Sequence, residues 1–177
     1  MTKNLKSGSS KFIILYHRSP FDEKIDEKGF RTWIDQKSPN GIIPTLRNLF
    51  RSKEEGTWIA WRKVTELSKE EDERIGMENP APFVLRRIPL SEKEINSFYH
   101  VTSKESFWPI LHTFPTFFDI NNADWQIFEE VNLRFAKAAC LEAKRDAIVW
   151  IHDYNLWLVP FFIRKERPDL RIAFFHH

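Results

Sequence analysis

The sequence contains a single cysteine, Cys140, which excludes an internal disulfide. Cys140 lies in the apolar-periodic stretch FAKAACLEA, so we expect a small core residue in a reducing compartment. No apolar run approaches the roughly eighteen residues of a membrane span, since even LWLVPFFI is followed by Arg164 and Lys165. Residues 1–11 are polar and lack the apolar core of a signal peptide. We therefore expect a cytoplasmic protein with a flexible leader at residues 1–11 and no membrane partner.

The sequence also lacks an excess of either charge and a recognisable metal-binding pattern. Its 27 Lys and Arg residues against 25 Asp and Glu residues leave a net charge of +2, with acids and bases interleaved along the chain. That balance disfavours a nucleic-acid partner. His152, His176 and His177 are accompanied by no cysteine pair and no carboxylate–histidine helix motif, so we predict no metal site.

What the sequence does contain is enough apolar material for one folded domain. The chain has 177 residues, 42% of them hydrophobic and 15% aromatic, which suffices for one sizeable core but not for two full α/β domains. Continuous apolar runs are typical of strands buried on both faces of a parallel sheet. Such runs lie at 11–18, 57–64, 83–90, 146–153 and 171–177.

Helical patterns alternate with these runs. Apolar residues at three- and four-residue spacing predict one long helix over 123–144, and Ser91 with Glu94 forms a capping box that opens another helix. We interpret 19–37 as an exposed loop or hairpin and 66–76 as a solvated helix or loop. The order of elements predicts an α/β fold with an open, mostly parallel sheet and helices on both faces.

This topology indicates where a ligand would bind. In open α/β sheets, ligands bind outside the carboxyl ends of the strands, where Arg18, Asp153 and His177 are expected. The turn SPNG at 38–41 leads into a helix at Gly41 and can hold an anion, beside the guanidinium of Arg18. An ordinary turn is the alternative interpretation of SPNG. The sequence therefore favours an anionic ligand at this edge.

Other candidate residues each have a structural alternative. Asp153 can accept hydrogen bonds from sugar hydroxyls, or it can cap a helix that begins at Asn155. His176 and His177 point to opposite faces if the strand continues through them, so only one of them should face the ligand. Tyr99 and Trp108 offer flat faces to a polar ligand, or they belong to the core.

Several stretches resemble one enzyme family. HDYNLWLVP, RIAFFHH, FWPILH and SPNG look like the N-terminal half of the retaining glycosyltransferases that include trehalose-6-phosphate synthase and glucosylglycerol-phosphate synthase. Trehalose-phosphate synthases typically read SNR, GGL, LWP, HDYHL and FFLH, whereas this chain has YHR, NGI, FWP, HDYNL and FFHH. These departures, with KSPNGIIPTL and FYHVTSKESFWPILH, are similar to the glucosylglycerol-phosphate branch.

The resemblance implies a fold and a set of site residues. The family has a two-lobed GT-B fold, so residues 12–177 would form an incomplete, Rossmann-like, acceptor-side N-terminal domain. The C-terminal nucleotide-sugar lobe would be absent from this truncated chain and would normally pack on this domain. Matched motif by motif, the resemblance implies three roles: acceptor binding by Arg18, Tyr99 and Trp108; donor binding by Gly41 and by Asn40, which replaces a glycine; and positions at the reacting sugars for Asp153 and His177.

The resemblance also implies an activity. The branch transfers glucose from ADP-glucose to glycerol 3-phosphate with retention, without a metal or cofactor, and the product serves osmolyte synthesis under salt stress. The alternative within the family is a trehalose-6-phosphate synthase with glucose 6-phosphate as acceptor. An alternative of another class is a non-catalytic phosphate- or sugar-binding fragment, and we expect the 177-residue chain alone to be inactive.

Overall fold

The computed structural model describes residues 8–36, 41–52, 56–64, 71–78 and 81–177. One sheet has the strand order β5-β6-β4-β1-β7-β8, and every neighbouring pair in it is parallel except β5 with β6. A separate antiparallel hairpin joins β2 to β3. The strands are β1 (Ser10–Leu15), β2 (Phe21–Ile25), β3 (Arg31–Asp35), β4 (Gly56–Lys63), β5 (Glu73–Met77), β6 (Phe83–Leu90), β7 (Ala143–His152) and β8 (Arg171–Phe175). The predicted open, mostly parallel sheet is confirmed.

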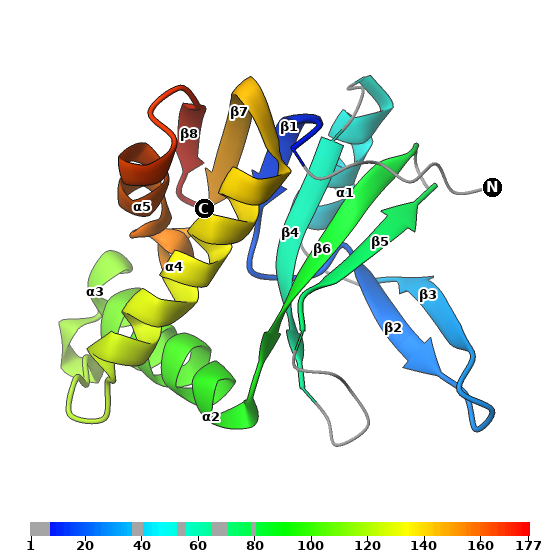
Figure 1. Ribbon diagram of the computed structural model, residues 1–177. Helices are drawn as coiled ribbons and strands as arrows, with labels where there is room; N and C mark the ends of the chain where they lie inside the picture. Colours follow the sequence, from blue (N-terminus) through cyan, green and yellow to red (C-terminus); the bar gives the residue numbers. More distant parts are fainter. Residues whose placement is uncertain (1–7, 37–40, 53–55, 65–70, 79–80) are drawn as a thin grey trace.

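Helices cover both faces of this sheet. Figure 1 shows α4 and α5 in front of the strands and α1 behind them. The α-helices are α1 (Ile42–Leu49), α2 (Glu92–Ile95), α3 (Trp108–Leu111), α4 (Trp125–Glu142) and α5 (Val159–Glu166). A helix with π-type hydrogen bonding, η2 (Asn96–Phe107), joins α2 to α3, and short 3-10 turns lie at η1 (Phe50–Ser52), η3 (Pro115–Phe117) and η4 (Tyr154–Leu156).

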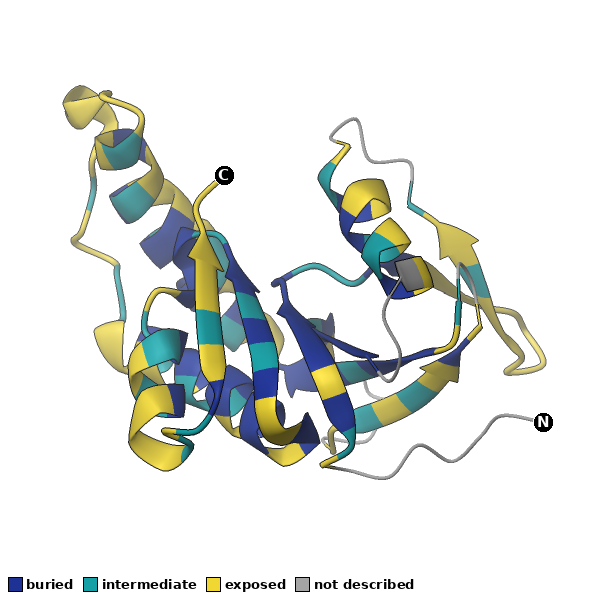
Figure 2. Ribbon diagram, turned by 90° about the horizontal axis from the view of Figure 1, so that it is seen from above, coloured by how far each residue is buried: buried dark blue, intermediate teal, exposed yellow. Residues whose placement is uncertain are grey.

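The central strand β1 explains why the apolar runs are continuous. Its alternate side chains point to opposite faces of the sheet, so Ile13 and Leu15 join the core under α4 while Phe12 and Ile14 join the core under α1. A strand that is covered on both sides needs apolar residues at every position. Figure 2 shows the contrast with the hairpin of β2 and β3, which is largely exposed.

Two predicted helix starts are confirmed by their capping contacts. Ser91 and Glu94 form the reciprocal capping box at the start of α2. Asp124 caps α4 through a 3.1 Å hydrogen bond from the backbone amide of Ile127. The long helix over 123–144 is thus present as α4, but it ends at Glu142, because the backbone turns to extended geometry at Ala143 and β7 begins there.

The interpretation of 66–76 as a solvated helix or loop is wrong at its C-terminal end. Residues 65–70 lie outside the described residues, but Glu73–Met77 form the edge strand β5, antiparallel to β6. Its charged side chains are held by ion pairs with distant partners, including Arg74 with the buried Glu142. The partners of Glu73 and Arg74 come from β3, β4, β6 and α4, so the local sequence contains no sign of them.

The strands deliver their polar ends to one edge of the sheet. His17 and Arg18 follow β1, His152 ends β7, and His177 follows β8. Strand β1 begins at Ser10, within the stretch 1–11 that we expect to be a leader, and residues 1–7 lie outside the described residues. Residues 19–37 contain the hairpin of β2 and β3, as one of the two interpretations predicts.

Candidate active site

Two cavities meet at the carboxyl edge of the sheet. The smaller, of about 200 Å³, is the cation-lined cavity, and the larger, of about 450 Å³, is the apolar cavity. His177 and Ile42 line both of them. The cation-lined cavity is also bounded by Tyr16, His17, Arg18, Tyr99, Lys104, Trp108, His112, Asp153, Tyr154 and Asn155, and the apolar cavity by Gly41, Thr45, Leu46, Trp150, His152 and Phe175.

Arg18 is fixed in the cation-lined cavity from two sides. Its Nη2 donates a 3.0 Å hydrogen bond to the Tyr99 hydroxyl, and its carbonyl oxygen accepts a 3.0 Å hydrogen bond from the Trp58 indole. The hydrogen bond with Tyr99 raises the pKa of Arg18, which keeps its guanidinium charged. The ammonium of Lys104 lies 5.1 Å from the centre of the Tyr99 ring. Two cations therefore flank one phenol, an arrangement suited to a phosphate group.

The η2 helix brings the predicted aromatic pair together. Its π-type winding forms hydrogen bonds between residues five apart, which brings Tyr99 and Lys104 to one face, and Trp108, the first residue of α3, lines the same cavity. The Trp108 ring stacks on His112 with centroids 4.4 Å apart, and both residues line the cavity. The Trp108 ring also stacks on Phe114, with centroids 5.9 Å apart, and the part of the ring that stays exposed belongs to the cavity wall.

Asp153 caps the short helical turn η4, which begins at Tyr154, one residue before the helix start that the sequence predicts, and its role toward sugar hydroxyls stays a prediction. It lines the cation-lined cavity, and its Oδ1 accepts a 2.9 Å hydrogen bond from the backbone amide of Tyr154 at the start of η4. Its backbone has φ 76 and ψ 155, a conformation that non-glycine residues rarely adopt. Burial raises the pKa of the Asp153 carboxyl above its usual value. A strained aspartate at a cavity wall is typical of a functional position.

Of the two adjacent histidines, His177 is the one that faces the cavities. Its Nε2 lies 3.0 Å from Nδ1 of His152, and the two rings stack with centroids 5.2 Å apart. His176 packs instead against Tyr154, with ring centroids 5.8 Å apart. Strand β8 ends at Phe175 and does not continue through the pair, as the prediction assumed, but the two rings still pack against different residues. Desolvation lowers the pKa of His177, while the carboxylate of Asp153 acts in the opposite direction.

The SPNG turn is described only from Gly41 onward. Gly41 caps the N-terminus of α1 with φ −63, and it lines the apolar cavity, not the cation-lined one. A Cβ atom at Gly41 would meet no other atom within 4 Å, so nothing in the described residues requires glycine sterically. Asn40 lies outside the described residues. Because Ile42 lines both cavities, the helix start and Arg18 still belong to neighbouring walls of one region.

Several residues at the cation-lined cavity are absent from the sequence-based prediction. His17, Lys104, His112 and Asn155 line it in addition to the predicted set. Asn155 is 1% exposed, and its side-chain amide has no hydrogen-bond partner among the described residues. His17 and Asn155 do lie beside predicted site residues in the sequence. Lys104 and His112 depend on the winding of η2 and α3, which the sequence pattern does not show.

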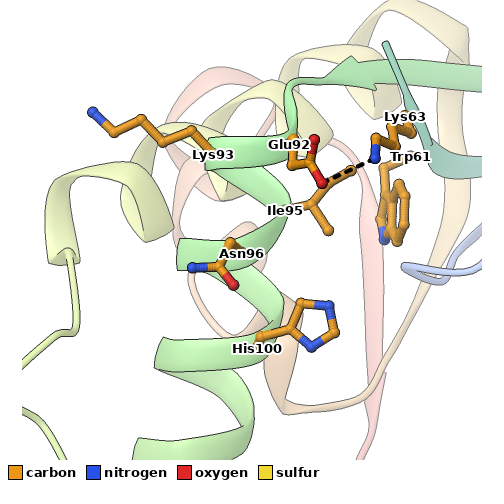
Figure 3. A pocket seen from close by; sticks show the side chains of 7 residues that line it. All are labelled: Trp61, Lys63, Glu92, Lys93, Ile95, Asn96 and His100. Atoms are coloured by element: carbon orange, nitrogen blue, oxygen red, sulfur yellow. Dashed lines mark ion pairs between the residues drawn. The ribbon is translucent and has the colours of Figure 1, made fainter. Parts of the chain in front are cut away.

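Figure 3 shows a further pocket, of about 580 Å³, which is lined in part by His100, the residue that follows Tyr99 in η2. It is bounded by Trp61, Ile95, Asn96 and His100, and the ion pair between Lys63 and Glu92 closes one side at 3.2 Å. The residues that the sequence predicts for the site do not line it. The two cavities that share His177 are therefore the candidate active site.

The described residues contain neither a cluster suited to a metal ion nor a helix suited to a membrane. Across residues 8–36, 41–52, 56–64, 71–78 and 81–177, no group of three or more His, Cys, Asp or Glu side chains is arranged to hold a metal ion. Within the same part of the chain, no helix has both the length and the apolar character needed to cross a membrane.

The family model and the similar proteins all indicate one family of glycosyltransferases. The model of glycosyltransferase family 20 matches residues 10–177. The chain is 47% identical over 169 residues to a glucosylglycerol-phosphate synthase of Picosynechococcus sp. and 46% identical over 171 residues to one of Synechocystis sp.. It is 34% identical over 171 residues to a trehalose-6-phosphate synthase of Mycolicibacterium smegmatis. These alignments cover 95%, 96% and 97% of this chain but 34%, 34% and 32% of the relatives, so the chain spans about a third of their length.

Solved structures show the same fold. A trehalose-6-phosphate protein from E. coli bound with UDP-2-fluoro glucose matches with a TM-score of 0.73 at 21% identity, over 95% of this chain and 33% of that one. A UDP-forming alpha,alpha-trehalose-phosphate synthase from Burkholderia xenovorans in complex with glucose-6-phosphate matches with a TM-score of 0.71 at 20% identity, over 94% and 33%. The architecture of this chain is thus that of a GT-B N-terminal domain.

Proposed function

This chain belongs to glycosyltransferase family 20, and on that premise we propose that the protein which contains it transfers glucose from ADP-glucose to glycerol 3-phosphate with retention. The observation that carries the proposal is the graded similarity. Identity is 47%, 46% and 43% to three glucosylglycerol-phosphate synthases, but 34% to a trehalose-6-phosphate synthase over a similar span. The product, glucosylglycerol phosphate, would serve osmolyte synthesis, and we place the reaction in the cytoplasm.

The cation-lined cavity supports a phosphorylated acceptor. We assign Arg18, Tyr99 and Trp108 to the acceptor: the guanidinium to its phosphate, the phenol to holding that guanidinium, and the indole to its carbon skeleton. Lys104 adds a second cation to the same wall. A phosphate that is held between two cations leaves the other end of the acceptor free to reach toward His177.

The apolar cavity supports the donor sugar. Gly41 lies at the N-terminus of α1, where backbone amides and the helix dipole favour an anion such as the leaving diphosphate. We assign Gly41 and Asn40 to the donor on this ground. Most of the nucleotide would be bound by a second lobe that packs on this domain. The nucleotide sugar is a substrate, and we propose no metal or other cofactor for the reaction.

The shared wall supports transfer between the two cavities. Retention requires the acceptor hydroxyl to attack the face of glucose from which the diphosphate departs, so donor and acceptor must meet at one point. His177 lies at that junction because it lines both cavities, and Asp153 lines the acceptor side. We assign both residues to orienting the reacting sugars. Positive groups and helix amides would stabilise the negative charge that develops on the leaving group.

The test is a substrate panel on the full-length product of the gene that encodes this chain. ADP-glucose and UDP-glucose would each be tested with glycerol 3-phosphate and with glucose 6-phosphate, and the anomeric configuration of the product would be read by NMR. Turnover of ADP-glucose with glycerol 3-phosphate, with an α-linked product, would support the proposal. A preference for glucose 6-phosphate would assign the protein to the trehalose branch. A folded full-length protein without turnover would favour a non-catalytic phosphate- or sugar-binding module.

A further inference from the structure

The hydrogen bond between His152 and His177 joins the wall of the site to the buried sheet. Nδ1 of His152 lies 3.0 Å from Nε2 of His177, across 25 positions of sequence. The two residues differ in burial, because His152 is 1% exposed and His177 lies at the solvent-exposed edge. An exposed imidazole has no fixed orientation of its own, so the buried partner is what positions it.

Packing holds the His152 ring tightly. Aromatic rings surround it: Trp150 with centroids 4.5 Å away, Tyr16 at 6.2 Å and Phe175 at 6.3 Å. Burial lowers the pKa of His152 to about 4, so the ring is neutral at physiological pH. A neutral imidazole carries one N–H donor and one acceptor nitrogen. The contact with His177 therefore depends on which nitrogen of His152 carries the proton.

The surroundings of Nε2, the other ring nitrogen of His152, indicate which nitrogen carries the proton. Nε2 of His152 is buried and has no hydrogen-bond partner among the described residues. A buried N–H without a partner is rarer in proteins than a buried acceptor without one. The favoured arrangement thus places the proton on Nδ1 of His152, which donates to Nε2 of His177. His177 must then carry its own proton on Nδ1.

We propose that His152 is a positioning residue that holds His177 in the Nδ1–H tautomer, so that His177 offers an N–H donor to an oxygen of the transferred sugar where the two cavities meet. The use of this donor in glucosyl transfer rests on the proposed function, whereas the tautomer itself does not. With the opposite tautomer, His177 would present a lone pair to the sugar and could not donate to its oxygen atoms. A donor that is fixed before the sugar binds costs no reorganisation during the reaction.

The direct test is the tautomeric state of His177 in the 177-residue chain. The chain contains six histidines, so a sample labelled with ¹⁵N in histidine gives a small set of long-range ¹H–¹⁵N correlations, recorded at about pH 8 where imidazoles are neutral. We expect the His177 pattern to be that of the Nδ1–H tautomer. An Nε2–H pattern for His177, or rapid averaging between both tautomers, would overturn the proposal without any substitution being made.

Two substitutions at His152 separate positioning from packing. His152→Asn places an amide N–H near the position of Nδ1, whereas His152→Leu fills space without a donor. We expect His177 to keep the Nδ1–H tautomer in His152→Asn and to lose it in His152→Leu. The matched control is His176→Leu, the residue that the family often has there, which should leave the His177 pattern unchanged. Loss of the tautomer in the control, or its retention in His152→Leu, would contradict the proposal.

Kinetics of the full-length gene product provide the second measurement. We expect His152→Leu to lower kcat roughly tenfold to a hundredfold with little change in KM for the acceptor, and His152→Asn to recover most of that loss. Equal loss in both variants would indicate a packing role and overturn positioning. If the wild-type protein transfers no glucose, the proposed function fails, but the tautomer of His177 is still decided by NMR.

Discussion

Arg18 and Tyr99 lie 81 positions apart in the sequence, and a 3.0 Å hydrogen bond joins the Arg18 guanidinium to the Tyr99 hydroxyl at the cation-lined cavity. Arg18 follows the central strand β1, and Tyr99 belongs to η2, in the helical layer beside the sheet. The hydrogen bond therefore connects the two layers at the cavity to which we assign the acceptor phosphate. The cation is held in place before any ligand arrives, which lowers the cost of binding.

Removal of the Tyr99 hydroxyl should weaken acceptor binding selectively. Tyr99→Phe leaves the ring in place but frees the guanidinium, and a hydrogen bond to a charged group is worth about 1.5 to 3 kcal/mol, so KM for the phosphorylated acceptor should rise roughly tenfold or more. Arg18→Lys should have a similar effect because a lysine lacks the forked geometry. Steady-state kinetics of the full-length gene product would measure this. The control is Arg145→Lys, at a position whose side chain is 86% exposed, and it should leave the acceptor KM unchanged. An unchanged acceptor KM in Tyr99→Phe would contradict the assignment of Tyr99 to the acceptor.

The backbone of Asp153 predicts an unusual order of stabilities. At φ 76 and ψ 155, alanine keeps a strain of about 1 to 3 kcal/mol that glycine does not have, so Asp153→Gly should be more stable than Asp153→Ala by ~1 kcal/mol. Both variants lose the carboxylate and should lose turnover. Urea denaturation of the 177-residue chain would compare them. The control position is Glu130, on the surface of α4, where the alanine variant should be more stable than the glycine variant, as is usual in helices. An alanine variant that is also the more stable one at Asp153 would contradict the predicted backbone strain.

The sequence is sufficient to predict the parallel strands of the sheet and the edge at which the candidate site residues gather, because both depend on local patterns. Continuous apolar runs marked β1, β4, β6, β7 and β8, and the residues that follow them gave Arg18, Asp153 and His177 as candidates. These signals are carried by neighbouring residues in the chain. The carboxyl ends of parallel strands lie at one edge of a sheet, so these candidates can be grouped there without knowledge of the packing.

The remaining features depend on contacts between distant residues. The sequence does not indicate strand β5, because the partners that neutralise its charges, such as Glu142 and Arg87, lie on other elements. The winding of η2, which brings Lys104 beside Tyr99, does not follow from a hydrophobic period. The contact of His152 with His177 requires the register of β7 against β8, which pairs His152 with Phe175 and which only the folded sheet fixes.

Two buried histidines should make stability fall in mild acid. Burial lowers the pKa of His17 to about 3 and that of His152 to about 4, from an ordinary value of 6.5. The unfolded chain takes up these protons near pH 6.5, whereas the folded chain does not, so unfolding free energy should fall between pH 6.5 and about 4 by up to ~1.4 kcal/mol per pH unit for each histidine. Urea denaturation over this range would measure the slope. His17→Asn should roughly halve the part of this slope that comes from the two histidines. A slope that is unchanged in His17→Asn would contradict the prediction.

Substitution of the buried Glu142 should lower the stability of the protein without removing its activity. Glu142 is fully buried, and its oxygens accept hydrogen bonds from Arg74 and Arg86 at 2.9 and 3.0 Å, which ties α4 to β5 and β6 through residues that line neither cavity. Glu142→Gln would remove the carboxylate that pairs with Arg74 and leave Arg86 with only its second partner, Asp72, so unfolding free energy should fall by about 3 to 5 kcal/mol. Glu92→Gln, which removes an exposed pair with Lys63, should change it by no more than ~0.5 kcal/mol. Urea denaturation would measure both losses of unfolding free energy. Equal losses in the two variants would contradict the prediction, because the buried ion pairs would then contribute no more than an exposed, solvent-screened pair.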